Sequence, residues 1–318
     1  MKSVMYHYVR PETNRQPNYY YLDADDFRNQ LDYFEREFGF VTKDDFLSVV
    51  RGESDSGNLP SGVVLTFDDG FRDHYETVYP ELQKRGLWGI FYVPVGPYKT
   101  GNLLDVHRTH VLLGEVSGAK LLEYARDIIT EEMIPHKRRD EFHKQTYKNQ
   151  DDTEATKRVK RILNYFISDK YQTKVLDEMT KRAKYNPVAV SEFYMTRDEL
   201  KEMHANDMIV GGHTKSHPVL SKLSSENQRT QIVASFDYLD NAVGGLSERT
   251  FCYPYGKSHS FDGDTVSILN DINCEWCFKV ESADITINDI ADRPQALPRY
   301  DCTDFPHGGA SGSIGSSG

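Results

Sequence analysis

The sequence has few cysteines, no long apolar run and no excess of basic residues. Its four cysteines do not form the two pairs of a zinc ribbon, because only Cys274 and Cys277 share a C-x-x-C spacing, so we expect free, largely buried thiols. The formal net charge of -11 disfavours a nucleic-acid partner. No stretch resembles a membrane span, and residues 1–10 lack the apolar core of a signal peptide. We therefore expect a cytoplasmic globular chain that carries no signal for its oligomeric state.

Apolar segments alternate with helical patterns along most of the chain. Hydrophobic residues make up 38% of the sequence and aromatic residues 12%, which is enough to build a packed core. A strand–helix–strand rhythm predicts an α/β fold with a largely parallel sheet. We expect about seven strands, at 2–9, 62–67, 88–95, 208–213, 249–255, 275–280 and 297–300. We expect helices at 23–37, 73–84, 196–205, 225–243 and 264–269, with Thr196 and Glu199 as a capping box.

Residues from about 98 to 190 break this rhythm. The stretch is rich in Lys, Arg, Asp and Glu and has few strand signals. It predicts a helical insertion between two strands of one catalytic domain that spans residues 1–307. Residues 308–318 are rich in Gly and Ser and predict a flexible tail.

Two adjacent carboxylates, Asp68 and Asp69, follow the apolar strand at 62–67 and precede Gly70. In open α/β sheets and barrels, ligand chemistry gathers at the carboxyl ends of the strands. There one carboxylate can hold a metal ion while the other accepts a proton. A turn with an Asp helix cap is the structural alternative.

A pair of histidines, His213 and His217, follows the strand at 208–213. We expect these two residues, four apart, to lie on one face of a helical turn, which suits two imidazole ligands of one metal. Gly211 and Gly212 leave room for close backbone approach. Two surface histidines in a loop are the alternative. The Asp pair and the His pair both end predicted strands, so together they favour a metal site with open positions.

Three further strings lie at predicted strand ends. Tyr253, Pro254, Tyr255 and Gly256 can shape a pocket wall that stacks on a sugar ring, or form a plain turn. His7 follows the first strand, and Arg299 in the last one can hold a catalytic carboxylate or make a surface ion pair. His107 and His110, after the strand at 88–95, are candidates for contact with substrate at the pocket rim.

In this order, the strings T-F-D-D-G at 66–70 and H-T-K-S-H at 213–217 resemble the first two motifs of the NodB-homology polysaccharide deacetylases, carbohydrate esterase family four. The resemblance covers roughly residues 1–95 and 190–305 and leaves the helical stretch unmatched. It implies an incomplete or distorted (β/α) barrel with a metal at the carboxyl ends of the strands.

The resemblance also implies roles for individual residues. Asp68 becomes the general base, and Asp69, His213 and His217 become the metal ligands. The third motif departs from the common form, because many members have an Arg where this chain has Cys252. The Y-P-Y-G version resembles the branch that includes biofilm poly-N-acetylglucosamine deacetylases. That branch implies His7 as the general acid and Arg299 as the partner of the catalytic carboxylate.

These roles predict a metal-dependent hydrolase that removes an N-acetyl group from an amino sugar. The metal is a divalent ion, with Zn²⁺ as the first choice and Co²⁺ or Ni²⁺ as substitutes. The substrate is free, polymeric, nucleotide-linked or lipid-linked, and we expect an intermediate of surface polysaccharide or glycolipid biosynthesis. The alternatives are a deformylase or O-acetyl esterase of the same family, a catalytically silent saccharide-binding homologue, and a scaffold that docks partners through its helical insertion.

Overall fold

The computed structural model describes residues 1–11, 19–53, 58–135, 154–185 and 188–311, which fall into two compact units. The first unit contains Met1–Glu12, Tyr21–Asn102 and Val190–Ser311, and the second contains Thr13–Tyr20, Leu103–Ala189 and Gly312–Gly318. Most of the predicted flexible tail, residues 312–318, lies outside the described residues.

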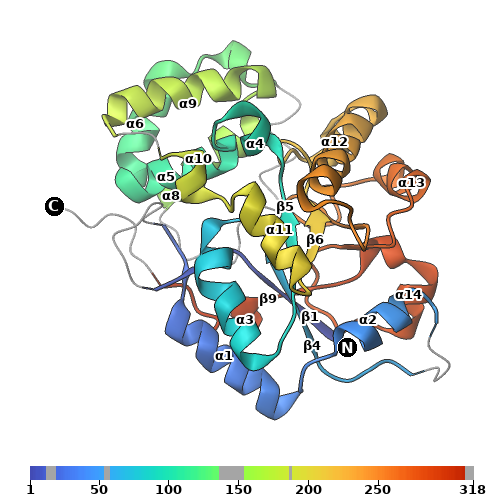
Figure 1. The fold of residues 1–318 in the computed structure, drawn as a ribbon. Helices are drawn as coiled ribbons and strands as arrows, with labels where there is room; N and C mark the ends of the chain where they lie inside the picture. Colours follow the sequence, from blue (N-terminus) through green and yellow to red (C-terminus); the bar gives the residue numbers. More distant parts are fainter. Residues whose placement is uncertain (12–18, 54–57, 136–153, 186–187, 312–318) are drawn as a thin grey trace. The chain divides into compact units, whose positions relative to one another are not determined.

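A sheet of seven parallel strands forms the centre of the first unit (Figure 1). The strand order β8-β7-β6-β5-β4-β1-β9 follows the chain from β4 to β8, as expected for strands joined by helical crossovers. The predicted incomplete (β/α) barrel is confirmed. The strands are β1 (Lys2–Tyr6), β4 (Val63–Asp68), β5 (Ile90–Val93), β6 (Ile209–Gly212), β7 (Thr250–Cys252), β8 (Trp276–Phe278) and β9 (Tyr300–Asp301).

The two faces of the sheet have different chemistry, because side chains alternate along each strand. In β4, Val63, Leu65 and Phe67 belong to an apolar core shared with the helices. Val64 belongs to a second core on the opposite face, and Asp68 lies on that same face by alternation. The row of side chains on this second face, which we call the inner face, therefore ends in a carboxylate.

Helices cover the outer face of the sheet (Figure 1). Phe27, Leu31 and Phe34 of α1 pack into this outer core at the spacing predicted from the sequence. The predicted capping box of Thr196 and Glu199 is confirmed at the start of α11. The covering helices are α1 (Ala24–Glu37), α3 (Tyr79–Arg85), α11 (Arg197–Ala205), α12 (Ser225–Val243) and α13 (Gly263–Asp271), with the π-helix η1 (His74–Val78) before α3.

The predicted first strand is divided in two. β1 ends at Tyr6, and the chain then forms the short strand β2 (Val9–Arg10), which pairs with β3 (Leu22–Asp23) in a separate ladder. His7 consequently lies in the connection at the carboxyl end of β1, where Tyr6 pairs with Phe67 of β4.

A helix that was not predicted from the sequence covers the inner face, the one that carries Val64 and Asp68, at the amino ends of the strands. In α2 (Lys43–Val50), Phe46 packs edge-on against Trp276, with 5.3 Å between ring centroids. The other elements of this unit are α4 (Gly96–Thr100), α10 (Val190–Phe193), η4 (Leu220–Lys222), α14 (Ile287–Asp292), η5 (Pro294–Ala296) and η6 (Cys302–Asp304).

The segment from Leu297 to Asp301 connects the two edges of the sheet. Leu297 bridges Phe278 of β8 in a parallel pairing, and its amide donates to the carbonyl of Cys277. Three residues later, Tyr300 pairs with Val4 of β1. The predicted strand at 297–300 is thus shared between two neighbours, and Arg299 lies between them.

The described part of the second unit is helical. α6 packs against α8 and α9, and α5 packs against α9. The elements are α5 (Asp105–Glu115), α6 (Gly118–Ile128), η2 (Glu131–Met133), α8 (Glu154–Arg161), η3 (Ile162–Phe166) and α9 (Asp169–Ala183). Part of the predicted insertion, at 136–153 and 186–187, lies outside the described residues. No described helix in either unit is both long and apolar enough to cross a membrane.

Candidate active site

At the carboxyl end of β4, Asp68 and Asp69 have different backbone conformations. Asp68 is the last residue of the strand, whereas Asp69 has a left-handed φ of 78° and Gly70 follows with φ 64°. A non-glycine residue in this region is strained, and such residues are common in active sites. The turn re-aims the second carboxylate, which an extended strand would send to the opposite face. Both side chains are buried.

Arg299 holds the carboxylate of Asp68 in a two-pronged ion pair. Its Nη1 donates to Oδ1 of Asp68 at 2.8 Å and its Nη2 donates to Oδ2 at 2.7 Å, while Nη1 also donates to Thr66 Oγ1 at 2.9 Å. Burial raises the pKa of Asp68, but the guanidinium of Arg299 outweighs burial and lowers that pKa to about 2. The ion pair also raises the pKa of Arg299 although burial opposes it. Asp68 is therefore ionised at neutral pH.

Asp69, His213 and His217 bring one carboxylate oxygen and two imidazole nitrogens together. Asp69 Oδ1 lies 3.5 Å from Nε2 of His213 and 3.5 Å from Nε2 of His217. Ligand atoms bound about 2.0–2.2 Å from a tetrahedral zinc ion lie roughly 3.4 Å apart. The spacing and the donor set fit a divalent metal such as Zn²⁺.

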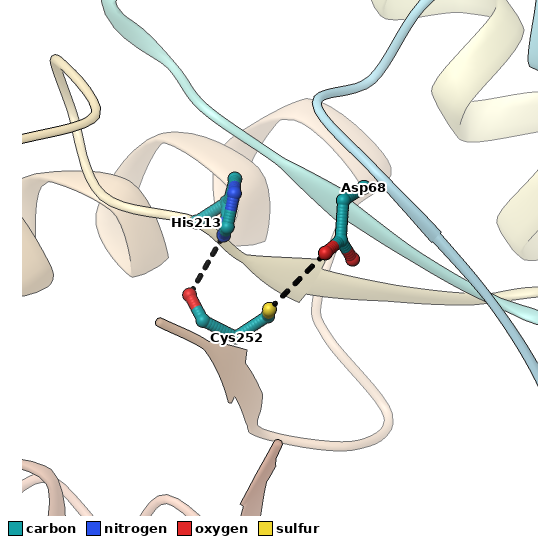
Figure 2. A group of neighbouring side chains, drawn as sticks. All are labelled: Asp68, His213 and Cys252. Atoms are coloured by element: carbon teal, nitrogen blue, oxygen red, sulfur yellow. Dashed lines mark hydrogen bonds between the residues drawn. The ribbon is translucent and has the colours of Figure 1, made fainter. Parts of the chain in front are cut away.

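The hydrogen bond on the far side of His213 supports the same interpretation. Nδ1 of His213 lies 2.7 Å from the carbonyl oxygen of Cys252 and donates its proton there, so in the neutral ring Nε2 carries the lone pair (Figure 2). Burial lowers the pKa of His213, but nearby Cys252 and Asp69 outweigh burial and raise it well above its usual value. The space around Nε2 therefore favours a positive charge, either a proton or a metal ion.

Asp68, His213 and Cys252 form a second group of possible ligands, which has His213 in common with the first. Figure 2 shows these three side chains. The thiol of Cys252 donates to Oδ2 of Asp68 at 3.4 Å, and Arg299 Nη2 lies 2.8 Å from its sulfur. Burial raises the pKa of this thiol. The guanidinium of Arg299 beside this sulfur and Asp68 repels a cation, so the first group is the better candidate for a metal site.

The loop from His213 to His217 corrects one prediction. The two histidines were expected on a helical turn, but the segment is irregular, with left-handed φ values of 66° at Thr214 and 57° at His217. The two imidazoles still approach each other, with 4.9 Å between ring centroids. The expectation for Gly211 is confirmed, because a Cβ there would meet the ring of Tyr92 at 2.5 Å.

His7 is exposed at the carboxyl end of β1, and its backbone is fixed by another histidine. Nε2 of the buried His74 donates to the carbonyl of His7 at 2.7 Å. Burial lowers the pKa of His74 to about 4, so its ring is neutral at pH 7. The charge of His7 also contributes to the low pKa of Asp68, which places the two side chains in one electrostatic environment.

The Y-P-Y-G turn presents one of its tyrosines to the site. Tyr255 has a φ of 64°, and its ring packs edge-on against His217 with 4.9 Å between centroids. Tyr253 is buried, stacks on Phe261 at 3.8 Å and donates its hydroxyl to the carbonyl of Gln295. Its ring therefore has no exposed face to offer a sugar and instead supports the turn. A Cβ at Gly256 would meet Val280 at 2.3 Å, and Pro254 lies buried between the tyrosines.

His107 and His110 belong to α5 of the second unit. His107 is buried, and the ring of His110 stacks on Tyr19 with 4.7 Å between centroids. Their contact with substrate remains a prediction.

Two polar residues near the site escaped the sequence reading. His74 follows the T-F-D-D-G motif by only four residues, but nothing in the sequence tells a buried hydrogen-bonding His from a surface one. Gln231 lies on α12, and its side chain contacts the loop between the two metal-ligand histidines. No local pattern indicates that contact, because it depends on how the helix packs.

Comparison with known proteins gives a partial match to one family. Residues 165–276 match a family model described as polysaccharide deacetylase, a range that includes His213 and His217 but not Asp68 and Asp69. No curated protein matches the sequence.

Several solved structures share the fold. The Streptococcus pyogenes deacetylase PplD, solved with acetate, is 17% identical, with a TM-score of 0.56 over 95% of this chain and 91% of that one. IcaB from Ammonifex degensii is 19% identical, with a TM-score of 0.50 over 94% and 90%. A de-N-acetylase from Aggregatibacter actinomycetemcomitans is 15% identical, with a TM-score of 0.51 over 94% and 93%. The chain is thus similar to polysaccharide deacetylases in sequence over residues 165–276, and it shares the fold of these solved structures over most of its length.

Proposed function

We propose that this chain is a metal-dependent hydrolase that removes the N-acetyl group of an amino sugar. The observation that carries the proposal is the arrangement at the carboxyl ends of β4 and β6. There an ionised Asp68, held by Arg299, lies next to a carboxylate and two imidazoles whose spacing suits one metal ion. The relation to polysaccharide deacetylases gives this chemistry a carbohydrate substrate with an acyl group.

Asp69, His213 and His217 would hold the ion, with Zn²⁺ as the first choice and Co²⁺ or Ni²⁺ as substitutes. When bound, the ion supplies Lewis-acid activation of water and of the acyl carbonyl. The open coordination positions needed for this follow from a set of only three protein ligands.

The proposed chemistry of the chain itself begins with Asp68. Its carboxylate accepts the proton of the attacking water, and Arg299 keeps that carboxylate ionised and oriented. A carboxylate with so low a pKa is a weak base, so its contribution depends on a water that is already activated. We assign stabilisation of the oxyanion that forms to a backbone amide beside Tyr255, whose ring contacts His217.

The leaving amine needs a proton, which we assign to His7. Its exposed imidazole stands at the carboxyl end of the strand next to β4, and His74 fixes the backbone that carries it. The edge-on contact of Tyr255 with His217 brings the Y-P-Y-G turn to the candidate metal site, so Tyr255 and Gly256 are the proposed sugar contacts. The biosynthetic setting and the motif branch expected from the sequence remain predictions, as does the single catalytic domain of residues 1–307.

Release of acid from matched substrates tests the proposal. Zinc-loaded protein would be incubated with N-acetylglucosamine oligomers, their N-formyl counterparts and an O-acetylated xylan, and free acetate and formate would be measured. We expect acetate from the N-acetyl oligomers, at a rate far above that of an Asp68→Asn control. Faster formate release would indicate a deformylase, and acetate from xylan alone an esterase. Saccharide binding without release of either acid would favour the silent homologue and contradict the proposal.

A further inference from the structure

The loop between the two metal-ligand histidines has a costly backbone conformation. Thr214 and His217 both adopt left-handed φ values, which non-glycine residues rarely occupy and which strain the backbone. A loop of this kind keeps one shape only if its surroundings enforce it. The contacts that enforce it therefore decide whether both imidazoles face Asp69.

Three donors of the loop converge on one oxygen atom. Oε1 of Gln231 accepts from the amides of Lys215 at 3.2 Å and Ser216 at 2.9 Å, and from the hydroxyl of Ser216 at 3.1 Å. Further hydrogen bonds to the loop come from within it and from the segment after β5. Thr214 Oγ1 accepts from the amide of His217 at 2.9 Å, and the amides of Val95 and Gly96 donate to carbonyls of the loop.

Gln231 stands on a helix that is itself fixed against the sheet. In α12, the neighbouring Ile232, Ser235 and Phe236 are buried, and a Cβ at Gly212 would lie 3.3 Å from the hydroxyl oxygen of Ser235. The helix thus packs directly behind the strand that leads into His213. Through its hydrogen bonds, Gln231 fixes the loop to this helix, which is not next to the loop in sequence.

We propose that Gln231 is a positioning residue that preorganises the His213–His217 loop and thereby sets the affinity of the metal site. The inference rests on the proposed metal site and adds a residue outside its ligand set. A neutral amide suits the task, because its oxygen accepts several N–H and O–H donors without adding charge beside the ligands. Without that oxygen, two backbone amides lose their acceptor and the loop samples other conformations. Metal binding must then also order the loop, which weakens the affinity for the metal.

Four proteins test this assignment: the wild type, Gln231→Met, Gln231→Glu and Thr230→Ala. Met keeps the length of the side chain but has no acceptor oxygen, whereas Glu keeps the acceptor. Thr230 is an exposed neighbour on α12 whose hydroxyl bonds only within the helix, to the carbonyl of Glu226. Each metal-free protein would be titrated with Zn²⁺ in competition with a chromogenic chelator, and its thermal unfolding would be recorded without metal.

We expect Gln231→Met to bind zinc about 10–100-fold more weakly, the range typical of residues that support metal ligands. Gln231→Glu and Thr230→Ala should stay within about threefold of the wild type, and the metal-free proteins should melt at similar temperatures. If Gln231→Met does not fold, Gln231→Asn would be tested in the same way, because its side chain is one methylene shorter and moves the acceptor oxygen away from the loop. If a folded variant without the acceptor binds zinc as tightly as the wild type, the inference about Gln231 is wrong but the proposed function is not affected. The same holds if Gln231→Glu loses as much zinc affinity as Gln231→Met. Absence of zinc binding by the wild type would overturn the proposed function as well.

Discussion

Asp68 and Asp69 are adjacent in sequence and have separate partners. Asp68 continues the inner row of β4 and meets Arg299, whereas the left-handed turn at Asp69 brings its carboxylate to the two histidines. The same side-chain chemistry therefore supplies an ionised carboxylate held by Arg299 and a candidate metal ligand within one dipeptide. The difference is one of backbone conformation and not of residue type.

The Asp68→Asn variant separates these two roles. Because Asp68 is outside the assigned ligand set, the variant should bind zinc as the wild type does. Because an amide does not accept the proton, kcat should fall by roughly 10²–10⁴-fold. Zinc content and initial rates of acetate release measure the two effects. Loss of zinc in this variant would move the metal to the group of Asp68, His213 and Cys252, and an unchanged kcat would remove Asp68 as the base.

At the scale of residues, the sequence indicates site residues that stand in a recognisable motif. It misses site residues whose role depends on how distant elements pack. The Asp pair and the His pair could be found because each follows an apolar strand. The bidentate contact of Arg299 with Asp68 joins positions 231 residues apart, so only the resemblance to a family suggested it. Gln231 and His74 carry no signal at all, because a buried and an exposed polar residue look alike in one sequence.

At the scale of elements, the π-helix η1 places a neutral histidine in the outer core. His74 begins this element, packs edge-on against Phe71 at 5.6 Å and donates to the carbonyl of His7. Such helices are frequent near functional sites. Here the element couples the turn after Asp69 to the backbone of the proposed general acid.

Burial of His74 makes the fold sensitive to acid. Its pKa is about 4 in the folded chain and 6.5 when unfolded, so the unfolded chain takes up a proton first as the pH falls. The stability contributed by the neutral ring is complete above pH 6.5 and decreases by up to about 3 kcal/mol as the pH falls to 4. His74→Gln keeps an N–H donor but does not titrate, so it should lack this loss.

Urea unfolding of both metal-free proteins at pH 7 and pH 4 measures the difference. We expect the free energy of unfolding of the wild type to fall by about 3 kcal/mol more than that of the variant. Equal losses in the two proteins would mean that His74 is not the responsible group.

The position of an element was easier to predict than its boundaries or its conformation. The helix at 225–243 matches α12 residue for residue, because a long amphipathic pattern and the cap at Ser224 define both ends. The helical turn at 213–217 was wrong, since a four-residue spacing fits a constrained loop equally well. The strand at 297–300 is divided between β8 and β1, which no local pattern anticipates.

At the scale of the whole molecule, the strand–helix rhythm was sufficient for the fold class. Seven parallel strands with covering helices follow from apolar runs that alternate with amphipathic segments. The second unit has no motif that suggests a task, and its part in substrate choice stays a prediction. The family match over residues 165–276 supports a carbohydrate deacetylase, while the metal and the sugar are proposals that rest on the site.

The most direct test of this account is to measure zinc content and acetate release on the same samples of the wild type and Asp69→Ala. The account predicts one equivalent of zinc in the reconstituted wild type together with acetate release from an N-acetylated amino sugar, and loss of both in the variant. A variant that keeps stoichiometric zinc, or a wild type that releases acetate equally well after complete removal of metal, would contradict it.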